Sequence, residues 1–481
     1  MAPRSGALAL FCCFALDELR RRAGVKRWSL VAPSGKQDLL DHLADRLGSP
    51  IERTVQLMSK VKTTLWWDQF AHLRKKNEHQ QEHAFARALI SLPSIAEMLA
   101  LVLTDWIDAQ HELLSRLERD SVQLRRFAGA SIRSGCIKRF VPGLSDPHHM
   151  GRTVTKVGFL NGKYLIYRPR MRAGERLWSQ IIRWINTAKF SPDLKTVTAL
   201  SRGTYSWERF FPGRPCLSLT EVKQFYVRWG AQFALARIFG FTDLHFENWV
   251  ASRGHPILVD AEVFGPDASS LQRRGLNVPK LPPLLATGLL PFCSRNGLDY
   301  RGVAPFDLVE SFGSPPSCWP RYRQKYYEPV DFSAEILRGF ASIIEFIWKD
   351  RSRRRRLEML LKRSGRIRRR VLVRSTQEYR LLLEKSLRPE IFLFLNSRYF
   401  LLLRSCRKDA PSRQIAAAEA RALVRCSIPH FISAPNRPKA SLPSEREMWL
   451  SFRLLRRHFA PLGWTARSMI LTPKGIGARV R

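Results

Sequence analysis

Five polar residues between positions 243 and 262 have the types and spacing that phosphoryl transfer requires. Asp243, His245 and Asn248 fall in the segment TDLHFEN, and Asp260 and Glu262 close the segment ILVDAE. In phosphoryl transfer, one carboxylate orients or deprotonates the attacking hydroxyl, while an Asn and a second carboxylate hold Mg²⁺ against the phosphates. Each residue alone would be an ordinary turn or cap residue. Their order, with an apolar strand between the two groups, favours a kinase-like site and leaves its substrate open.

The elements that must position these residues are a helix, a loop and a strand. An apolar helix is expected over Phe225–Phe239, and the first three polar residues follow it in a loop. The apolar and partly β-branched run Pro256–Val259 predicts a buried strand, which a Gly-His-Pro turn enters. Asp260 and Glu262 lie two residues apart at its end, so both side chains should point to the same face.

A β-hairpin is the next predicted element that carries a candidate functional side chain. The segments Thr153–Phe159 and Lys163–Tyr167 are expected to pair across Asn161-Gly162, a strong hairpin signal. The second strand runs into Arg168 of the segment YRPR, where a cation could clamp a nucleotide phosphate. The alternative is a basic residue at a solvated strand end.

Two further polar segments lie outside the hairpin. The segment SDPHHMGR, directly before it, carries Asp146 and His148. In a later run rich in Lys and Arg, the segment RVLVRSTQEY would place Arg370 and Arg374 one helical turn apart, followed by Thr376. Two guanidinium groups on one face suit a phosphate. The alternative is a solvated basic face.

Composition limits the class of protein. A chain of 481 residues, 45% of them hydrophobic, can bury a large core in two or three subdomains, and no apolar run reaches the length of a membrane span. Eight cysteines without metal-ligand spacing indicate a reducing, cytoplasmic location. The formal net charge of +40 favours a polyanionic partner, either nucleic acid or an acidic peptide. Nucleic acid is the weaker choice, because the chain shows no recognisable nucleic-acid-binding module.

Taken together, the motifs resemble the dehydratase domain of class II lanthipeptide synthetases (the LanM family). The resemblance runs from about Pro93 to Phe431 and rests on SDPHHMGRTV, YRPR, YSWE, TDLHFEN with ILVDAE, TGLLP, RVLVRSTQEY and SIPHF, in this order. It implies an α+β fold, in which a lipid-kinase-like bilobal core carries helical N-terminal and C-terminal additions. It also implies that ATP and Mg²⁺ serve to phosphorylate Ser and Thr of a ribosomal precursor peptide. Elimination of phosphate then gives dehydroalanine and dehydrobutyrine.

The resemblance also implies roles for the candidate residues. The catalytic residues would be Asp146, His148, Asp243, His245, Arg370 and Thr376, of which Asp146, His148, Arg370 and Thr376 would serve elimination. The residues that bind the cofactors would be Arg168, Asn248, Asp260 and Glu262, with Asn248 and Asp260 as ligands of Mg²⁺.

The sequence departs from the family pattern in three ways. Arg168 stands where the family has a Lys, which is not a conservative replacement at a phosphate clamp. The zinc cyclase of full-length members does not follow the last motif, so either a separate cyclase or a truncated gene is expected. The N-terminal part is short for the family, so weaker recognition of the precursor's leader, which could be acidic, is expected.

Three regions are expected along the chain. Residues 1–130 would form a helical N-terminal support, with the clearest helix over Ser91–Leu117. Residues 131–300 would form the kinase-like core, and residues 301–481 a helical part with the elimination residues. Two other hypotheses stay open: a kinase-like protein that stops at the phosphopeptide or only binds peptide, and a basic nucleic-acid-binding protein.

Overall fold

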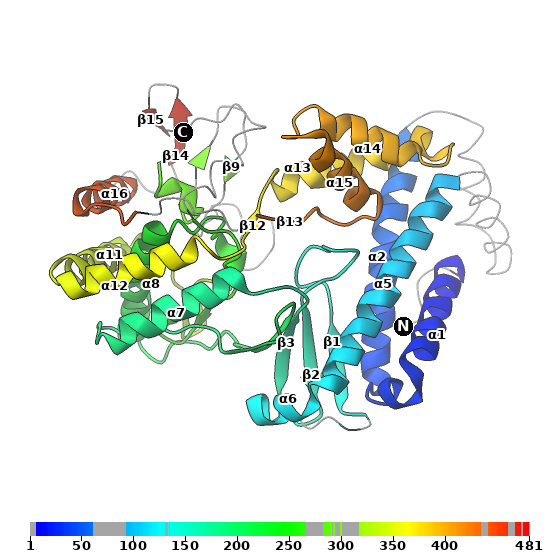
Figure 1. The fold of residues 1–481 in the computed structure, drawn as a ribbon, viewed down its shortest axis with the longest axis horizontal. Coiled ribbons are helices and arrows are strands. Elements are labelled where there is room, and N and C mark those ends of the chain that lie inside the picture. Colours follow the sequence, from blue (N-terminus) through cyan, green and yellow to red (C-terminus); the bar gives the residue numbers. More distant parts are fainter. Residues whose placement is uncertain are drawn as a thin grey trace. The chain divides into compact units, whose positions relative to one another are not determined.

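The computed structural model consists of two compact units, each assembled from segments that are far apart in the sequence (Figure 1). The structure describes residues 6–60, 93–129, 133, 135–265, 282–290, 292–293, 299–300, 317–433, 441–459, 467–472 and 475–480. Unit 1 comprises residues 1–171, 199–210 and 374–430, and unit 2 comprises residues 172–198, 211–373 and 431–481. The predicted three-part division along the sequence stays a prediction.

The N-terminal part of unit 1 is helical where the structure describes it, as the sequence predicts. Its helices are α1 (Gly6–Trp28), α2 (Pro33–Lys60), α5 (Pro93–Arg119) and α6 (Ser121–Ala128). Helix α5 confirms the predicted amphipathic helix, and Ser91, where that helix was expected to begin, lies outside the described residues. Its apolar residues recur at helical spacing and are buried, among them Ile95, Met98, Leu99, Val102 and Trp106.

A five-stranded antiparallel sheet completes the core of unit 1. Its strands are β1 (Ile137–Val141), β2 (Thr155–Phe159), β3 (Tyr164–Arg168), β4 (Ala199–Ser201) and β5 (Ser206–Arg209), in the order β1-β2-β3-β5-β4. The predicted hairpin is confirmed, because Thr155 pairs with Tyr167 and Gly162 has the left-handed backbone (φ +74°) that its turn needs. The sheet and helices α1, α2 and α5 share one hydrophobic core.

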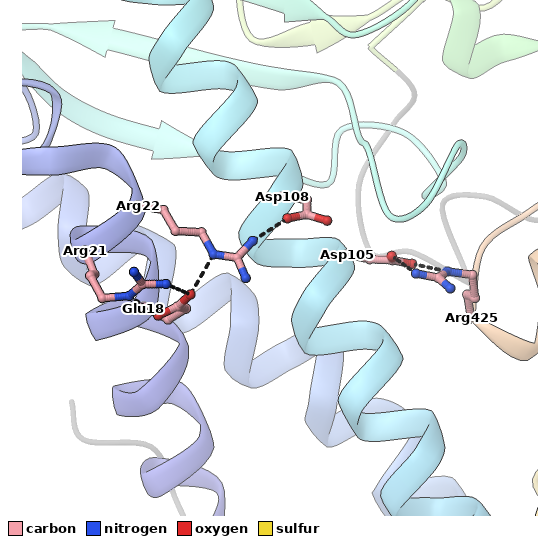
Figure 2. Close-up of polar contacts among 6 residues, drawn as sticks. All are labelled: Glu18, Arg21, Arg22, Asp105, Asp108 and Arg425. Atoms are coloured by element: carbon pink, nitrogen blue, oxygen red, sulfur yellow. Dashed lines mark hydrogen bonds and ion pairs between the residues drawn. The ribbon is translucent and has the colours of Figure 1, made fainter.

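The C-terminal segments of unit 1 form a helical group in which α13, α14 and α15 share a core of their own. They are α13 (Thr376–Ser386), the 3-10 helix η5 (Pro389–Phe392), α14 (Ser397–Arg407) and α15 (Arg413–Val424). Arg425, directly after α15, forms an ion pair with the buried Asp105 of α5 through two guanidinium nitrogens (Figure 2). Its Nε lies 2.9 Å from Oδ2 of Asp105. Arg22 similarly joins α1 to Asp108 of α5 at 2.7 Å (Figure 2). The two-pronged contact of Arg425 with Asp105 fixes the end of α15 against α5 more firmly than the single, exposed contact of Arg22 does for α1.

Unit 2 is built around the buried helix α8 (Leu219–Phe239), which begins six residues before the predicted start. Ser218 caps α8 by accepting a hydrogen bond from the backbone N–H of Glu221. Helix α11 (Ser333–Trp348) crosses α8 closely: a Cβ atom on Gly230 would lie 1.9 Å from the carbonyl oxygen of Ile336. The backbones of the two helices therefore touch at a position that tolerates no side chain.

The other elements of unit 2 surround this helix pair. The helices are α7 (Ala173–Thr187), α12 (Arg351–Ser364), α16 (Glu445–His458) and the short 3-10 helices η2 (Phe246–Asn248), η3 (Leu285–Thr287) and η4 (Pro329–Phe332). The strands are β6 (Trp249–Ser252), β7 (His255–Leu258), β8 (Phe292–Cys293), β9 (Asp299–Tyr300), β10 (Arg321–Tyr322), β11 (Lys325–Tyr326), β12 (Arg370–Val371), β13 (Phe431–Ile432), β14 (Arg467–Thr472) and β15 (Gly475–Val480). Helices combined with small, mostly antiparallel sheets agree with the predicted α+β class. In the part of the chain that the structure describes, none of the helices has the length and apolarity that a membrane span requires.

Candidate functional site

The hairpin β6–β7 brings the two groups of predicted phosphoryl-transfer residues together in unit 2. Strand β6 begins directly after residues 243–248, here called the catalytic loop, and β7 ends shortly before residues 260–262, here called the acidic segment. The two strands pair antiparallel over their whole length. The backbone N–H of Val259 then donates to the carbonyl of Asn248 at 2.9 Å. The catalytic loop and the acidic segment thus leave the hairpin side by side, and the predicted buried strand is confirmed, one residue earlier than expected.

Two further backbone hydrogen bonds hold the catalytic loop. The N–H of Thr242 donates to the carbonyl of Val263 at 3.0 Å, beyond the acidic segment. The N–H of Leu244 donates at 2.9 Å to the carbonyl of the buried Thr287, which belongs to the motif TGLLP. Pro291, the last residue of that motif, lies outside the described residues. The loop is therefore attached to the core on both sides, which gives this motif a structural function.

Within the catalytic loop, Asn248 and Asp243 contact each other. Asp243 has a left-handed backbone (φ +62°), a conformation that non-glycine residues seldom adopt and that often marks functional sites. The side-chain amide Nδ2 of Asn248 donates to the carbonyl of Asp243 at 2.6 Å. Asn248 ends a single 3-10 turn, η2, where the sequence suggested an irregular loop. His245 is partly exposed, with Nδ1 3.6 Å from a carboxylate oxygen of Glu247.

The acidic segment has the predicted alternation of side chains. Asp260 keeps partial exposure and the side chain of Glu262 is 10% exposed, whereas Ala261 between them is buried. Helix α7 lies directly on this segment: a Cβ atom on Gly174 would be 1.7 Å from the carbonyl oxygen of Ala261. Only a glycine allows the first turn of α7 to approach so closely. Gly174 therefore sets the position of both carboxylates, although no sequence motif singled it out.

Arg370 lies against the acidic segment. Its Nη1 is 3.4 Å from Oε1 of Glu262, and the two side chains are only 12% and 10% exposed. Strand β12, which carries Arg370, pairs antiparallel with β13, and the neighbouring Leu372 packs on Val263. The alternative of a solvated basic face is therefore wrong for Arg370. It holds for residues of α12 such as Arg355 and Lys362, which are exposed.

The predicted helical pairing of Arg370 with Arg374 is wrong. Helix α12 ends at Ser364, and the apolar, partly β-branched run after Arg370 is extended instead of helical. Arg374 serves the helical group of unit 1: its Nε is 2.9 Å from Oε1 of the buried Glu419, and its Nη2 donates to the carbonyl of Cys406. Arg374 is thus a structural residue of the group α13–α15.

Arg168 is buried in unit 1, so the alternative of a solvated strand end is wrong. Its Nε donates at 2.8 Å to Oε1 of Glu208 on the neighbouring strand β5, and the side chains are 5% and 3% exposed. A buried charge is stable only when it is paired and hydrogen-bonded. Glu208 belongs to the motif YSWE, which the resemblance contains without a role, so this partner was missed. The pair holds the guanidinium at the end of β3.

The residues predicted for elimination in unit 1 lie on residues 145–152, here called the SDPHH loop. His148 is held from two directions: its ring Nδ1 is 2.9 Å from the carbonyl oxygen of Ile428, and Ile428 donates its N–H to the carbonyl of Pro147. The hydroxyl of Ser427 accepts from the N–H of Gly151 at 3.0 Å. These contacts explain the motif SIPHF, which positions His148 through its backbone.

Asp146 and Thr376 are related through helix α13. The carboxylate of Asp146 is 3.1 Å from a guanidinium nitrogen of Arg380. Thr376 is the first residue of α13, directly after the N-cap Ser375, which forms a capping box with Glu378. Because Thr376 and Arg380 are four residues apart, they share a face of the helix. The structure therefore places Thr376 on the side of α13 that Asp146 approaches.

The side-chain oxygen atoms of Asn248 and Asp260 in unit 2 suit a magnesium ion whose other ligands would be phosphates and waters. Within the described ranges, no group of three or more His, Cys, Asp or Glu side chains could hold a metal ion. Mg²⁺ is usually bound by only one or two carboxylates, with phosphates and waters as the remaining ligands. Since Nδ2 of Asn248 is engaged by a backbone carbonyl, the amide presents its oxygen elsewhere. That oxygen and the carboxylate of Asp260 are the hard ligands that such a site requires.

The predicted site residues thus form three groups. Unit 2 brings together Asp243, His245, Asn248, Asp260, Glu262 and Arg370. Unit 1 carries Asp146 and His148 on one loop, Thr376 one helical turn before the Arg380 that meets Asp146 and, separately, Arg168. Sequence reasoning missed Glu208, Gly174 and His430, whose contacts join segments distant in the sequence.

Comparison with known proteins gives two matches. The family model described as "Domain of unknown function (DUF4135)" matches residues 92–311 and 306–434. The chain is also 24% identical over 324 residues to the lacticin 481/lactococcin biosynthesis protein LcnDR2 of Lactococcus lactis subsp. lactis. That alignment covers 59% of this chain, and the chain spans about a third (34%) of the length of this relative. The likeness indicated by the sequence motifs is confirmed by both matches.

Proposed function

We propose that the chain, which belongs to the DUF4135 family, dehydrates Ser and Thr of a ribosomal precursor peptide in lanthipeptide biosynthesis. The side chains would first be phosphorylated with ATP and then lose phosphate to give dehydroalanine and dehydrobutyrine, in a core similar to that of lipid kinases. The likeness to a lantibiotic biosynthesis protein supports the pathway. The observation that carries the chemistry is the catalytic loop, which the hairpin β6–β7 holds beside the acidic segment.

In the phosphorylation step, Asp243 is the group that accepts the proton of the attacking Ser or Thr hydroxyl. Its strained backbone and the hydrogen bond from Asn248 fix the direction of the loop before substrate binds. Asn248 and Asp260 would hold Mg²⁺, which would neutralise charge on the phosphates. His245, partly exposed on the same loop, would contact the substrate hydroxyl or a phosphate oxygen.

Arg168 binds the nucleotide phosphates in this proposal. The buried carboxylate of Glu208 restricts the guanidinium to one orientation, so little side-chain entropy is lost when a phosphate binds. The pairing of a strand cation with a glutamate is also the arrangement that protein kinases use to place the phosphate-binding Lys. Here the glutamate comes from a strand.

In the elimination step, His148 is the base that removes the α-proton. A backbone carbonyl can only accept a hydrogen bond, so Nδ1 of His148, which faces the carbonyl of Ile428, carries the proton in the neutral ring. Nε2 is then the basic nitrogen. Arg370 stabilises the departing phosphate, and Asp146 and Thr376 orient the groups around it. Cations placed where negative charge develops are typically among the largest contributions to such a step.

The surface charge supports an acidic segment in the peptide partner. Helix α12 exposes five cations, Arg351, Arg355, Arg356, Lys362 and Arg363, against one carboxylate, Glu358. Five of its first six residues are Arg, and the carboxylate at its N-terminus comes from the N-cap Asp350, which accepts from the backbone N–H groups of Ser352 and Arg353. A helix with such a basic surface suits a partner that supplies anions.

The proposal is tested by incubating the chain with ATP, Mg²⁺ and a set of Ser- and Thr-containing peptides that have acidic N-terminal halves. Mass spectrometry should show losses of about 18 Da per dehydrated residue, by the bookkeeping of water and phosphate. A gain of about 80 Da without loss would indicate a kinase that stops at the phosphopeptide. Unchanged peptides, together with unchanged ATP, would contradict the proposal.

A further inference from the structure

The structure brings three imidazole rings together in unit 1, of which only His148 has a role in the proposed function. The ring of His430 lies 5.5 Å from that of His148 and 4.4 Å from that of His149, measured between centroids. His148 and His430 are partly buried, whereas His149 is exposed. The three rings therefore form a row that leads from the predicted base to the surface.

The backbone of the SDPHH loop holds the outer ring in an unusual conformation. His149, Met150 and Gly151 follow one another with positive φ angles of 44°, 61° and 77°. Side-chain-bearing residues rarely adopt this conformation, and such strain clusters at functional sites. Two arginines fix the strained turn: Arg152 donates to the carbonyl of His149 at 2.5 Å, and Arg46 donates to that of Gly151 at 2.9 Å. The loop is thus built to keep His149 against His430.

We propose that His430 and His149 are positioning residues that take the proton from His148 and deliver it to water. This inference rests on the proposed function, in which Nε2 of His148 removes the α-proton of a phosphorylated residue. The N–H bond on His148 breaks as a new one forms on His430, and the positive charge moves with the proton to His149 and then to solvent. All three rings end neutral. A peptide with several Ser and Thr requires this step before each new elimination.

The charges around the row favour its return to the neutral state. Arg46 and Arg152 face the SDPHH loop from α2 and from the loop itself, and Arg380 faces it from α13. Glu112 compensates Arg152, and Asp146 compensates Arg380. Asp105 lies beside Gly151 and faces both Arg46 and Arg425, so it compensates one of these two guanidinium groups. The remaining charge is positive, which disfavours a further positive charge on the row.

The first test measures the rings themselves and needs no activity. Histidine-labelled parent protein and the variant His430→Phe, which keeps an aromatic ring, are titrated by NMR. In the parent, the signals of His148 and His149 should titrate as a coupled set. In His430→Phe the titrations of His148 and His149 should differ from those of the parent, because the ring that couples them has been removed. Identical titrations of His148 and His149 in both proteins would overturn the inference.

The second test measures elimination alone, with a synthetic phosphoserine peptide as substrate. His430→Phe should slow elimination on the order of 10²-fold, and added imidazole should restore most of the rate in His430→Ala, where the missing ring leaves room for it. Phosphorylation of the unmodified peptide should be unchanged. His111→Phe, a histidine of α5 outside the row, is the matched control and should behave like the parent.

The outcomes separate the inference from the proposed function. Slowed elimination with an unchanged pH profile and no response to imidazole would mean that His430 only supports the fold, which overturns the inference. Parent-like elimination in His430→Phe would overturn it as well. A parent protein that phosphorylates but never eliminates would refute the proposed function, whereas the NMR titration would still show whether the three rings act together.

Discussion

The contact of Gly174 with the acidic segment allows a sharp test of how the site is positioned. In Gly174→Ala the new Cβ atom would start 1.7 Å from the carbonyl oxygen of Ala261, and such atoms essentially never approach closer than 3.0 Å. The first turn of α7 and the acidic segment must therefore separate by at least 1.3 Å. Asp260 and Glu262 would move with the segment. A displacement of about 1 Å at reacting groups costs on the order of 100-fold in rate.

The assay is the initial rate of peptide phosphorylation, measured beside the thermal unfolding of each variant. Gly48→Ala in helix α2 is one control: its Cβ would meet nothing within 4 Å, so stability should be unchanged or up to about 1 kcal/mol higher. Gly230→Ala is a second control, since its Cβ would lie 1.9 Å from a carbonyl of α11 and should lower the unfolding temperature. Gly174→Ala with the parent's rate and unfolding temperature would refute the assignment of α7 as the support of the acidic segment.

Three substitutions test individual side chains. Asp260→Asn should abolish phosphorylation, because an amide lacks the charge that a magnesium ligand supplies; unchanged ATP-dependent modification would remove Asp260 from the metal site. Arg168→Lys should keep or raise the phosphorylation rate, since Lys preserves the charge that faces Glu208; a much slower variant would show that the pocket has adapted to the guanidinium. Arg370→Ala should slow elimination by about 10²- to 10³-fold, so that phosphopeptide accumulates in mass spectra, whereas the exposed Arg368→Ala should match the parent. Unmodified peptide with Arg370→Ala would instead assign Arg370 to phosphorylation or folding.

The local elements of the site could be predicted because their signals are local. Asn161-Gly162 fixes a hairpin turn through backbone preferences of two adjacent residues, and β2 and β3 pair as this turn requires. The run Pro256–Val259 is apolar enough to be a buried strand in most surroundings, and β7 lies there with a shift of one residue. The alternation of Asp260, Ala261 and Glu262 follows from the period of two in an extended chain.

The long-range contacts could not be predicted, for a physical reason. Arg168 and Glu208 are forty residues apart, and a single sequence does not show which carboxylate meets which cation. The mostly apolar run that begins at Arg370 is short, and its length is also compatible with a helix that continues α12. It forms strand β12 because it pairs with β13, about sixty residues later in the sequence. Tertiary pairing thus overrides the local charge pattern that suggested a helix.

The contact between Arg370 and Glu262 suggests how one site could serve two opposite demands. Phosphoryl transfer brings a phosphate to the peptide, and elimination requires the same phosphate to leave as an anion. Glu262 compensates the guanidinium of Arg370 in a nearly buried setting, where an unpaired charge would be costly. At 3.4 Å the pair is looser than the 2.8 Å pair of Arg168 with Glu208, so Arg370 can turn toward a phosphate at a smaller cost. Arg370 would pair with Glu262 when no phosphate is bound and with the phosphate when one is present.

Glu262→Gln should therefore leave Arg370 bound to phosphate after the reaction. Phosphate release would then become slower than bond cleavage, and a burst would precede the steady state. A steady state without a burst, at the parent's rate, would show that Glu262 does not compete for the guanidinium.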